Sequence, residues 1–215
     1  MFQVRLAGIA ALTICALIPI RAEDPSGNSG HVPAGSIAYQ YTGRANLATG
    51  TIYGYFTQIA GVPFSALFNG TPSESTAKFT FRADVSFVPL PGNGDLGGGQ
   101  FSVIPFVVAP GVFSVFFDPN PSHNWANADT FSKGPTISTI ATFSRTVDQQ
   151  TLIGPIAINA ASATLKSSSS IMLDMRPFDL GRLLPAGVTN ITTAYNAPVA
   201  VGTFALGGYG LATGK

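Results

Sequence analysis

The sequence predicts an all-β protein, built as an antiparallel β-sandwich of the jelly-roll type. Many short stretches alternate apolar and polar residues with the two-residue period of a β-strand. Turn-forming residues separate these stretches, since the 215 residues include 24 glycines and 16 prolines. Signals for long helices are nearly absent. Short alternating runs punctuated by Gly and Pro are typical of sandwiches and barrels, so a closed or partly open β-barrel is the alternative architecture.

The clearest strand signal covers residues 78–88, where apolar side chains such as Phe79 and Phe81 alternate with polar ones such as Thr80 and Arg82. This pattern predicts a strand with one face in water. Weaker alternation rich in β-branched and aromatic residues predicts further strands. They cover residues 36–42, 51–59, 136–147, 151–160, 170–176 and 198–206. We expect roughly nine to eleven strands in total.

Two short segments are the best helix candidates, and neither is expected to exceed roughly two turns. Residues 63–68 form the first. In the second, residues 178–184, Asp179 is suited to cap the helix. Pro185 and Gly187 follow and are suited to end it.

Residues 101–117 predict an unusual hairpin. The turn residues Ala109-Pro110-Gly111 separate two apolar runs, 101–108 and 112–117. Both faces of these strands are apolar, and a two-layer sandwich buries only one face of each sheet. The second face therefore needs cover from the 62–68 loop, a ligand or a neighbouring subunit. Cover from within the chain is the more ordinary outcome, but oligomerisation through this hairpin is also a hypothesis.

The first 22 residues have the organisation of a secretory signal peptide. An apolar stretch separates Arg5 from Arg21, and we place cleavage after Ala22. The stretch is shorter than the roughly 20 residues of a spanning helix, which argues against an uncleaved membrane anchor. No later apolar run of this kind follows, so we expect no stable membrane span in the mature chain. The single cysteine, Cys15, lies within this peptide, so the mature chain has no thiol. We therefore expect a secreted protein, extracellular or periplasmic.

The rest of the chain predicts one folded unit. Residues 23–34 combine acidic, Pro, Gly and Ser residues without apolar periodicity, which indicates a flexible lead-in. Residues 35–215 contain no long polar segment that could serve as an interdomain linker. Their length is ordinary for one domain, so we expect a single β-domain.

The charge content argues against nucleic acid as a partner and against catalysis. Only 10% of the residues are charged, and 11 Lys and Arg residues against 10 Asp and Glu residues leave a net charge of +1. No basic patch for a phosphate backbone is present. Candidates for acid-base catalysis are few. His31 and Glu23 lie before the folded domain, so His123 and Glu74 are the histidine and the glutamate expected to be ordered. The protein is therefore expected to be non-catalytic.

The best candidate for a binding region is the segment 118–131, DPNPSHNWANADTF, which contains the only tryptophan of the chain. In a carbohydrate site, the Trp125 ring would lie against sugar C–H groups while amide and carboxylate side chains bind hydroxyls. The candidate ligand-binding residues are Asp118, Asn120, His123, Asn124, Trp125, Asn127 and Asp129.

The same segment also has the spacing of a calcium loop. The first, third, fifth, seventh and twelfth positions are Asp118, Asn120, Ser122, Asn124 and Asp129. His123 replaces the usual glycine at the sixth position, the last ligand is Asp rather than Glu, and two prolines restrict the path. The third interpretation is a plain hairpin connection whose tryptophan folds back on the core, and it is favoured over both functional ones.

Together these observations predict a secreted, non-catalytic binding or surface-structural module at the cell surface. Its expected partner is a glycan or another surface protein, contacted through residues 118–131. No cofactor is expected, apart from the calcium hypothesis. Asn69 and Asn190 match the N-glycosylation pattern, but chance matches are common in a chain rich in Ser and Thr.

Two alternative functions remain open. One is a carbohydrate-active enzyme on a β-scaffold, which would need two aspartates about 5 to 10 Å apart beside Trp125. The other is a small outer-membrane β-barrel, which the low charge and the Tyr- and Phe-rich alternation favour.

Overall fold

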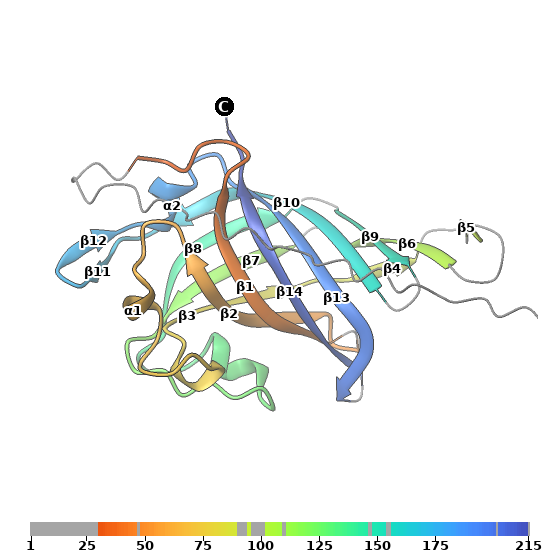
Figure 1. Ribbon diagram of the computed structural model, residues 1–215, viewed down its shortest axis with the longest axis horizontal. Helices are drawn as coiled ribbons and strands as arrows, with labels where there is room; N and C mark the ends of the chain where they lie inside the picture. The colour runs from red at the N-terminus through yellow and green to blue at the C-terminus, as the bar shows by residue number, and fades with distance from the viewer. Residues whose placement is uncertain are drawn as a thin grey trace, which may run out of the picture.

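Eight antiparallel strands close into a β-barrel in the computed structural model (Figure 1). The structure describes residues 30–46, 48–89, 94–95, 102–108, 111–145, 148–153, 156–200 and 202–214. The predicted signal peptide and residues 23–29 lie outside the described residues. Within the rest of the predicted lead-in, the N–H of Val32 donates to the carbonyl of Leu183. The chain is thus already attached to the barrel before residue 35.

The barrel strands pair in the order in which they occur along the chain. They are β1 (Ile37–Asn46), β2 (Thr51–Ile59), β3 (Phe79–Asp84), β7 (Val112–Phe117), β8 (Ser138–Arg145), β10 (Ile156–Ser168), β13 (Val188–Ala200) and β14 (Thr203–Ala212). The first and last of them, β1 and β14, pair with each other and close the ring.

The prediction of a jelly-roll sandwich is therefore wrong, and the barrel alternative is the better description. A sandwich has two sheets with open edges, whereas the pairing of β1 with β14 leaves the barrel wall without an edge. Inward and outward side chains alternate in the same way in both architectures, so alternation alone does not distinguish them.

Four further strands form an arm beside the barrel, at the first half of β10. They are β4 (Phe87–Pro89), β5 (Gly94–Asp95), β6 (Ser102–Val108) and β9 (Asp148–Ile153). In this arm β9 pairs with β10, and β6 pairs with β9, β4 and β5.

The predicted hairpin of residues 101–117 is wrong in its pairing. Both strands exist, but β6 pairs within the arm while β7 pairs with β3 and β8 in the barrel wall. The physical reason is that β7 is needed beside β3 to continue the ring. Ala109 and Pro110 of the predicted turn lie outside the described residues. Oligomerisation through this segment stays a prediction.

The remaining elements are short. They are α1 (Phe64–Leu67), the 3-10 helices η1 (Glu74–Thr76) and η2 (Ala128–Phe131), α2 (Leu180–Leu183) and the hairpin of β11 (Ile171–Leu173) and β12 (Arg176–Phe178). Among them, η2 contacts β2 and β3 on the outer wall. Both predicted helices are confirmed, and Asp179 caps α2 by accepting the N–H groups of Gly181 and Arg182. In the described part of the chain, no helix is long and apolar enough to cross a membrane.

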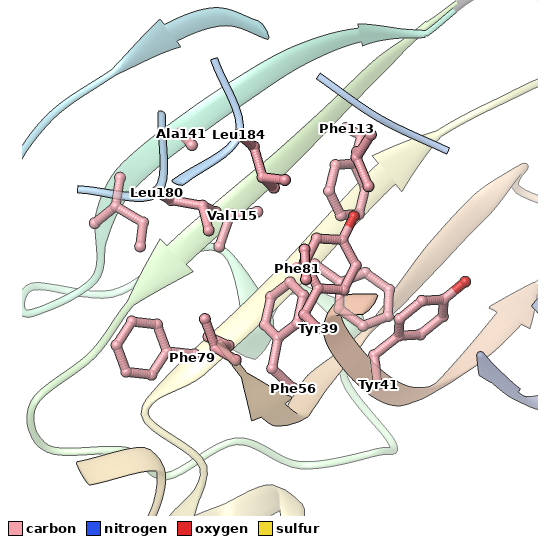
Figure 2. Close-up of a cluster of buried hydrophobic side chains, with 14 of the residues drawn as sticks. Tyr39, Tyr41, Phe56, Phe79, Phe81, Phe113, Val115, Ala141, Leu180 and Leu184 are labelled. Atoms are coloured by element: carbon pink, nitrogen blue, oxygen red, sulfur yellow. The ribbon is translucent and has the colours of Figure 1, made fainter. Parts of the chain in front are cut away.

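The interior of the barrel is filled by aromatic side chains. Figure 2 shows Tyr39, Phe56, Phe81 and Phe113 gathered in this core, where each is at most 7% exposed. Neighbouring rings meet edge to face, as where the centroids of Tyr39 and Phe56 lie 5.0 Å apart at 79°. Leu180 and Leu184 near α2 belong to the same core. Residues with opposite parity on β1 are polar and at least partly exposed: Gln40, Thr42, Arg44 and Asn46.

Two inward-facing glycines of β14 make room for the tyrosine rings of β1. Gly210 is the register partner of Tyr39, and Gly208 is that of Tyr41. A Cβ added at Gly210 would lie 2.4 Å from Cζ of Tyr39, and one at Gly208 would lie 2.7 Å from Oη of Tyr41. Each ring thus lies directly against the backbone of β14, where a side chain would otherwise stand.

The two hydroxyls reach beyond β14 to the next strand, β13. The Tyr39 hydroxyl donates to Oδ1 of Asn190 at 2.7 Å, and the hydroxyl oxygens of Tyr41 and Thr192 lie 2.5 Å apart. Burial raises the pKa of Tyr41 to about 12 and that of Tyr39 well above its usual value, so both hydroxyls stay protonated at neutral pH. Asn190 is only 7% exposed, so a glycan at this acceptor would not fit the folded barrel.

Glycines also lie against an aromatic ring on the opposite side of β1, where it pairs with β2. Gly43 of β1 and Gly54 of β2 are register partners. Cβ atoms at these positions would lie 3.0 and 2.9 Å from Cζ of Phe81. The ring from β3 therefore extends across the backbones of both neighbouring strands.

Replacing Gly210 by alanine should destabilise the barrel by about 1–3 kcal/mol, because the new methyl group overlaps a ring that is fully buried and hydrogen-bonded. Gly207→Ala is the matched control on the same strand, since its Cβ would meet its nearest atom at 3.6 Å, an ordinary contact. We expect the control to change stability by less than about 0.5 kcal/mol in denaturant unfolding followed by circular dichroism. Equal effects of the two substitutions would contradict the packing described here.

Candidate functional site

The segment 118–137, which connects β7 to β8, folds back over the outer wall of the barrel. The wall below it is formed by outward side chains of β2 and β3, namely Tyr53, Tyr55, Thr80 and Arg82. These positions belong to the polar face of the strand alternation, yet Thr80 is fully buried. The connecting segment supplies the cover.

Aromatic rings fill the space between the segment and the wall. Phe131 is fully buried, and its ring centroid lies 5.1 Å from that of Tyr53 and 5.0 Å from that of Trp125. The ring of His123 stacks on that of Phe131, with the two centroids 5.3 Å apart. Trp125 also contacts Tyr55, at 5.7 Å. This outer aromatic cluster is separate from the rings inside the barrel.

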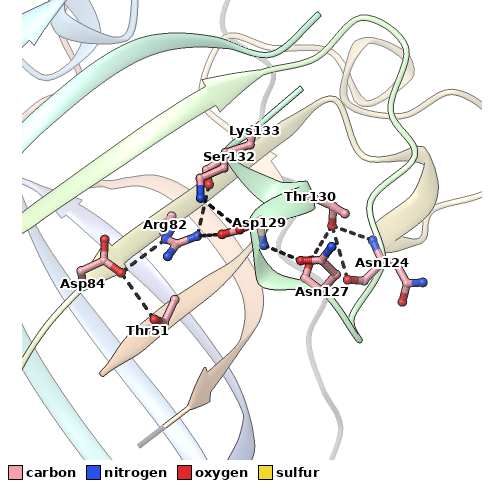
Figure 3. A network of polar contacts seen from close by, with 9 residues as sticks. All are labelled: Thr51, Arg82, Asp84, Asn124, Asn127, Asp129, Thr130, Ser132 and Lys133. Carbon is pink, nitrogen blue, oxygen red and sulfur yellow. Dashed lines mark hydrogen bonds and ion pairs between the residues drawn. The ribbon is translucent and has the colours of Figure 1, made fainter. Parts of the chain in front are cut away.

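Hydrogen bonds fix the segment to the wall. The Thr80 hydroxyl donates to the carbonyl of Phe131 at 2.7 Å, and the Tyr53 hydroxyl donates to the carbonyl of Trp125 at 3.0 Å. Figure 3 shows the ionic part of the connection, in which Nη1 of Arg82 lies 2.6 Å from Oδ1 of Asp129. The wall therefore binds the segment through the backbone carbonyls of Trp125 and Phe131 and through the carboxylate of Asp129.

A tight turn presents Trp125 at the surface. The N–H of Asn127 donates to the carbonyl of Asn124, which places Trp125 and Ala126 in the turn. The side-chain oxygen of Asn124 accepts the N–H of Ala126, and that of Asn127 accepts the N–H of Asp129. Asn and Asp commonly stabilise turns in this way, and here the bonds fix the conformation of the residues beside the indole.

Asp129 is held ionised by two cations. Hydrogen bonds from Lys133 and from Arg82 lower the pKa of its carboxyl. Arg82 also contacts Asp84, at 3.3 Å, so the two aspartates share one guanidinium. Asp84 and Asp129 thus act with Arg82 as an ionic clamp between the segment and the wall.

The first residue of the predicted calcium loop is turned inward. Asp118 is 4% exposed, and its Oδ1 accepts the N–H of Asn120 at 2.9 Å and the hydroxyl of Thr136 at 2.6 Å. The last residue, Asp129, is occupied by Arg82 and Lys133. Among the described residues, no group of three or more His, Cys, Asp or Glu side chains is placed to hold a metal.

His123 lies under the segment rather than at its surface. It is 2% exposed, and its Nδ1 contacts the carbonyl of Thr130 at 2.5 Å. Since a carbonyl only accepts, Nδ1 carries the proton and donates. Its Nε2 is buried and has no hydrogen-bond partner among the residues that the structure describes. Of the residues predicted to bind a ligand, His123 and Asp118 are therefore buried, Asn120, Asn124 and Asn127 are exposed, and Trp125 and Asp129 lie between.

Arg44 is a residue of this surface that sequence reasoning missed. Its Cζ lies over the Trp125 ring, 4.9 Å from the centroid. It comes from β1, where it is the register partner of Tyr53 on β2. The available signal was its position on the outward face of a strand, but nothing in the sequence indicates that a loop about eighty residues later would reach it.

A hollow of about 390 Å³ lies at the end of β14. Its lining consists of His31, Ala34, Pro185, Ala186, Thr213 and Gly214. Ligand sites combine an apolar surface with several converging polar groups, and this lining offers only His31 and Thr213 as polar side chains. The surface around Trp125 is therefore the better candidate.

The comparisons give no relative to guide the assignment. No protein-family model, no curated protein and no solved structure matches the chain.

Asp129→Asn should loosen the connecting segment, because it removes the charge that holds Arg82 and Lys133. Hydrogen exchange of a peptide covering residues 118–137 should become faster at neutral pH. The folded pKa of Asp129 is lowered, so its contribution is present above the unfolded value of about 4 and is lost as the pH falls through the folded value. The parent should therefore lose protection in acid, and the variant should lack that step.

The control is Asp174→Asn, at an exposed hairpin tip far along the chain. It should leave the exchange of residues 118–137 unchanged. If Asp129→Asn also left it unchanged at neutral pH, the ionic clamp would have no role in holding the segment.

Proposed function

We propose that the protein is a secreted, non-catalytic module that binds carbohydrate on the outer wall of its barrel, around Trp125. The observation that carries this proposal is the placement of the indole. It is partly exposed, it rests on Tyr53, Tyr55 and Phe131, and exposed amide side chains flank it at Asn124 and Asn127. An aromatic surface with a polar rim is typical of sugar sites.

The fixed conformation of the segment supports a binding role. A ligand that binds here would not have to order the turn, because its backbone hydrogen bonds and the contacts of Trp125 with the wall already exist. Affinity improves when the binding surface is ordered before the ligand arrives.

Two structural features favour this proposal over the alternatives. Asp129, which shares Arg82 with Asp84, has a lowered pKa and is unsuited to act as a glycosidase acid. A membrane barrel carries a continuous apolar band on its outer wall, whereas the outward residues of β1 include Gln40, Thr42 and Arg44, which interrupt such a band.

A glycan-array screen of the full chain, followed by titration of the positive glycans, tests the proposal. Trp125 is the only tryptophan, so its fluorescence reports directly on this surface. Trp125→Ala should weaken binding at least about tenfold, as expected for a central aromatic contact. Tyr209→Ala removes an exposed aromatic side chain on β14 and should leave the affinity unchanged. The proposal fails if the parent binds no glycan, or if Trp125→Ala binds as the parent does.

A further inference from the structure

The groups left free around Trp125 are hydrogen-bond donors. The side-chain oxygens of Asn124 and Asn127 already accept backbone N–H groups of the segment, which also fixes the orientation of each amide. Their NH₂ groups donate to no partner within the described residues. The local acceptors are thus used internally, and donors remain for a ligand.

Arg44 is the one cation of this surface that no acid neutralises within the described part of the chain. Arg82 binds Asp84 and Asp129, and Lys133 binds Asp129. The guanidinium of Arg44 is partly exposed and instead lies over the indole ring, 4.9 Å from its centroid. The ring restricts the guanidinium by a cation–π contact, and among the described residues its N–H donors have no acceptor.

We infer that the carbohydrate bound at this surface is acidic, with a carboxylate or sulfate held by Arg44 while the sugar contacts Trp125. A guanidinium can bind the two oxygens of such a group with parallel hydrogen bonds. The amides of Asn124 and Asn127 then donate to ring or hydroxyl oxygens. This inference rests on the proposed function and specifies its ligand.

The test compares galacturonic acid oligomers with their methyl esters, which have the same sugar backbone without the charge. A sulfated oligosaccharide and its unsulfated parent form a second pair that separates the two anions. Binding is followed by Trp125 fluorescence and by calorimetry with the full chain. We expect at least one anionic member to bind at least about tenfold more tightly than its neutral counterpart, and this preference to fall as salt is added.

Arg44→Gln, which removes the charge and leaves one NH₂ donor on a shorter side chain, should abolish the preference for the anionic member. Arg44→Lys, which keeps the charge but loses the planar fork, should retain part of it. Lys166→Gln is the matched control, because Lys166 is an exposed cation on β10, across the barrel from β2. It should change nothing. Circular dichroism verifies that each variant is folded.

The outcomes separate the inference from the proposed function. Equal binding of charged and neutral members of both pairs, or a preference that survives in Arg44→Gln, overturns the inference while carbohydrate binding stands. Absence of binding to every glycan, charged or neutral, overturns both.

Discussion

The barrel depends on the fit between aromatic rings and inward-facing glycines. Tyr39 occupies the space that a side chain at Gly210 would need. At Gly208 and Gly54 a side chain would meet a neighbouring backbone carbonyl as well as the ring of Tyr41 or Phe81. Because interiors are close-packed, rings and glycines must change together. The tyrosine hydroxyls then reach polar partners on β13, so the same rings connect three strands across the place where β1 and β14 close the ring.

This packing explains which parts of the fold the sequence predicts. Strand 51–59, both short helices and the all-β class are confirmed, because their patterns are local. The strand expected at 198–206 instead spans the end of β13 and the start of β14. Residues 188–197 were missed since Asn190 and Thr192 face inward as partners of the tyrosines and interrupt the apolar alternation. The end of β14 was also missed, because the inward positions of Gly208 and Gly210 carry no apolar side chain and interrupt the alternation.

The sequence predicts only one part of the candidate site, the connecting segment, and not the strand residues that it contacts. The segment 118–131 was identified from its composition, and the turn contacts that the structure shows at Asn124 and Asn127 are local. Its partners Arg44, Tyr53 and Tyr55 come from β1 and β2, so only the tertiary structure brings them together. The indole lies on the outer wall and not in the barrel core. The wall both fixes the segment and contributes Arg44 to the surface that it presents.

A double-mutant cycle between Tyr39 and Gly210 tests the central claim most directly. The single substitutions Tyr39→Leu and Gly210→Ala and their combination are compared by denaturant unfolding. If the ring occupies the space of the missing side chain, the alanine should cost less once the ring is gone, with a coupling energy of about 1–2 kcal/mol. Additive effects, within about 0.5 kcal/mol, would show that the ring and the glycine are independent and would contradict this account of the barrel.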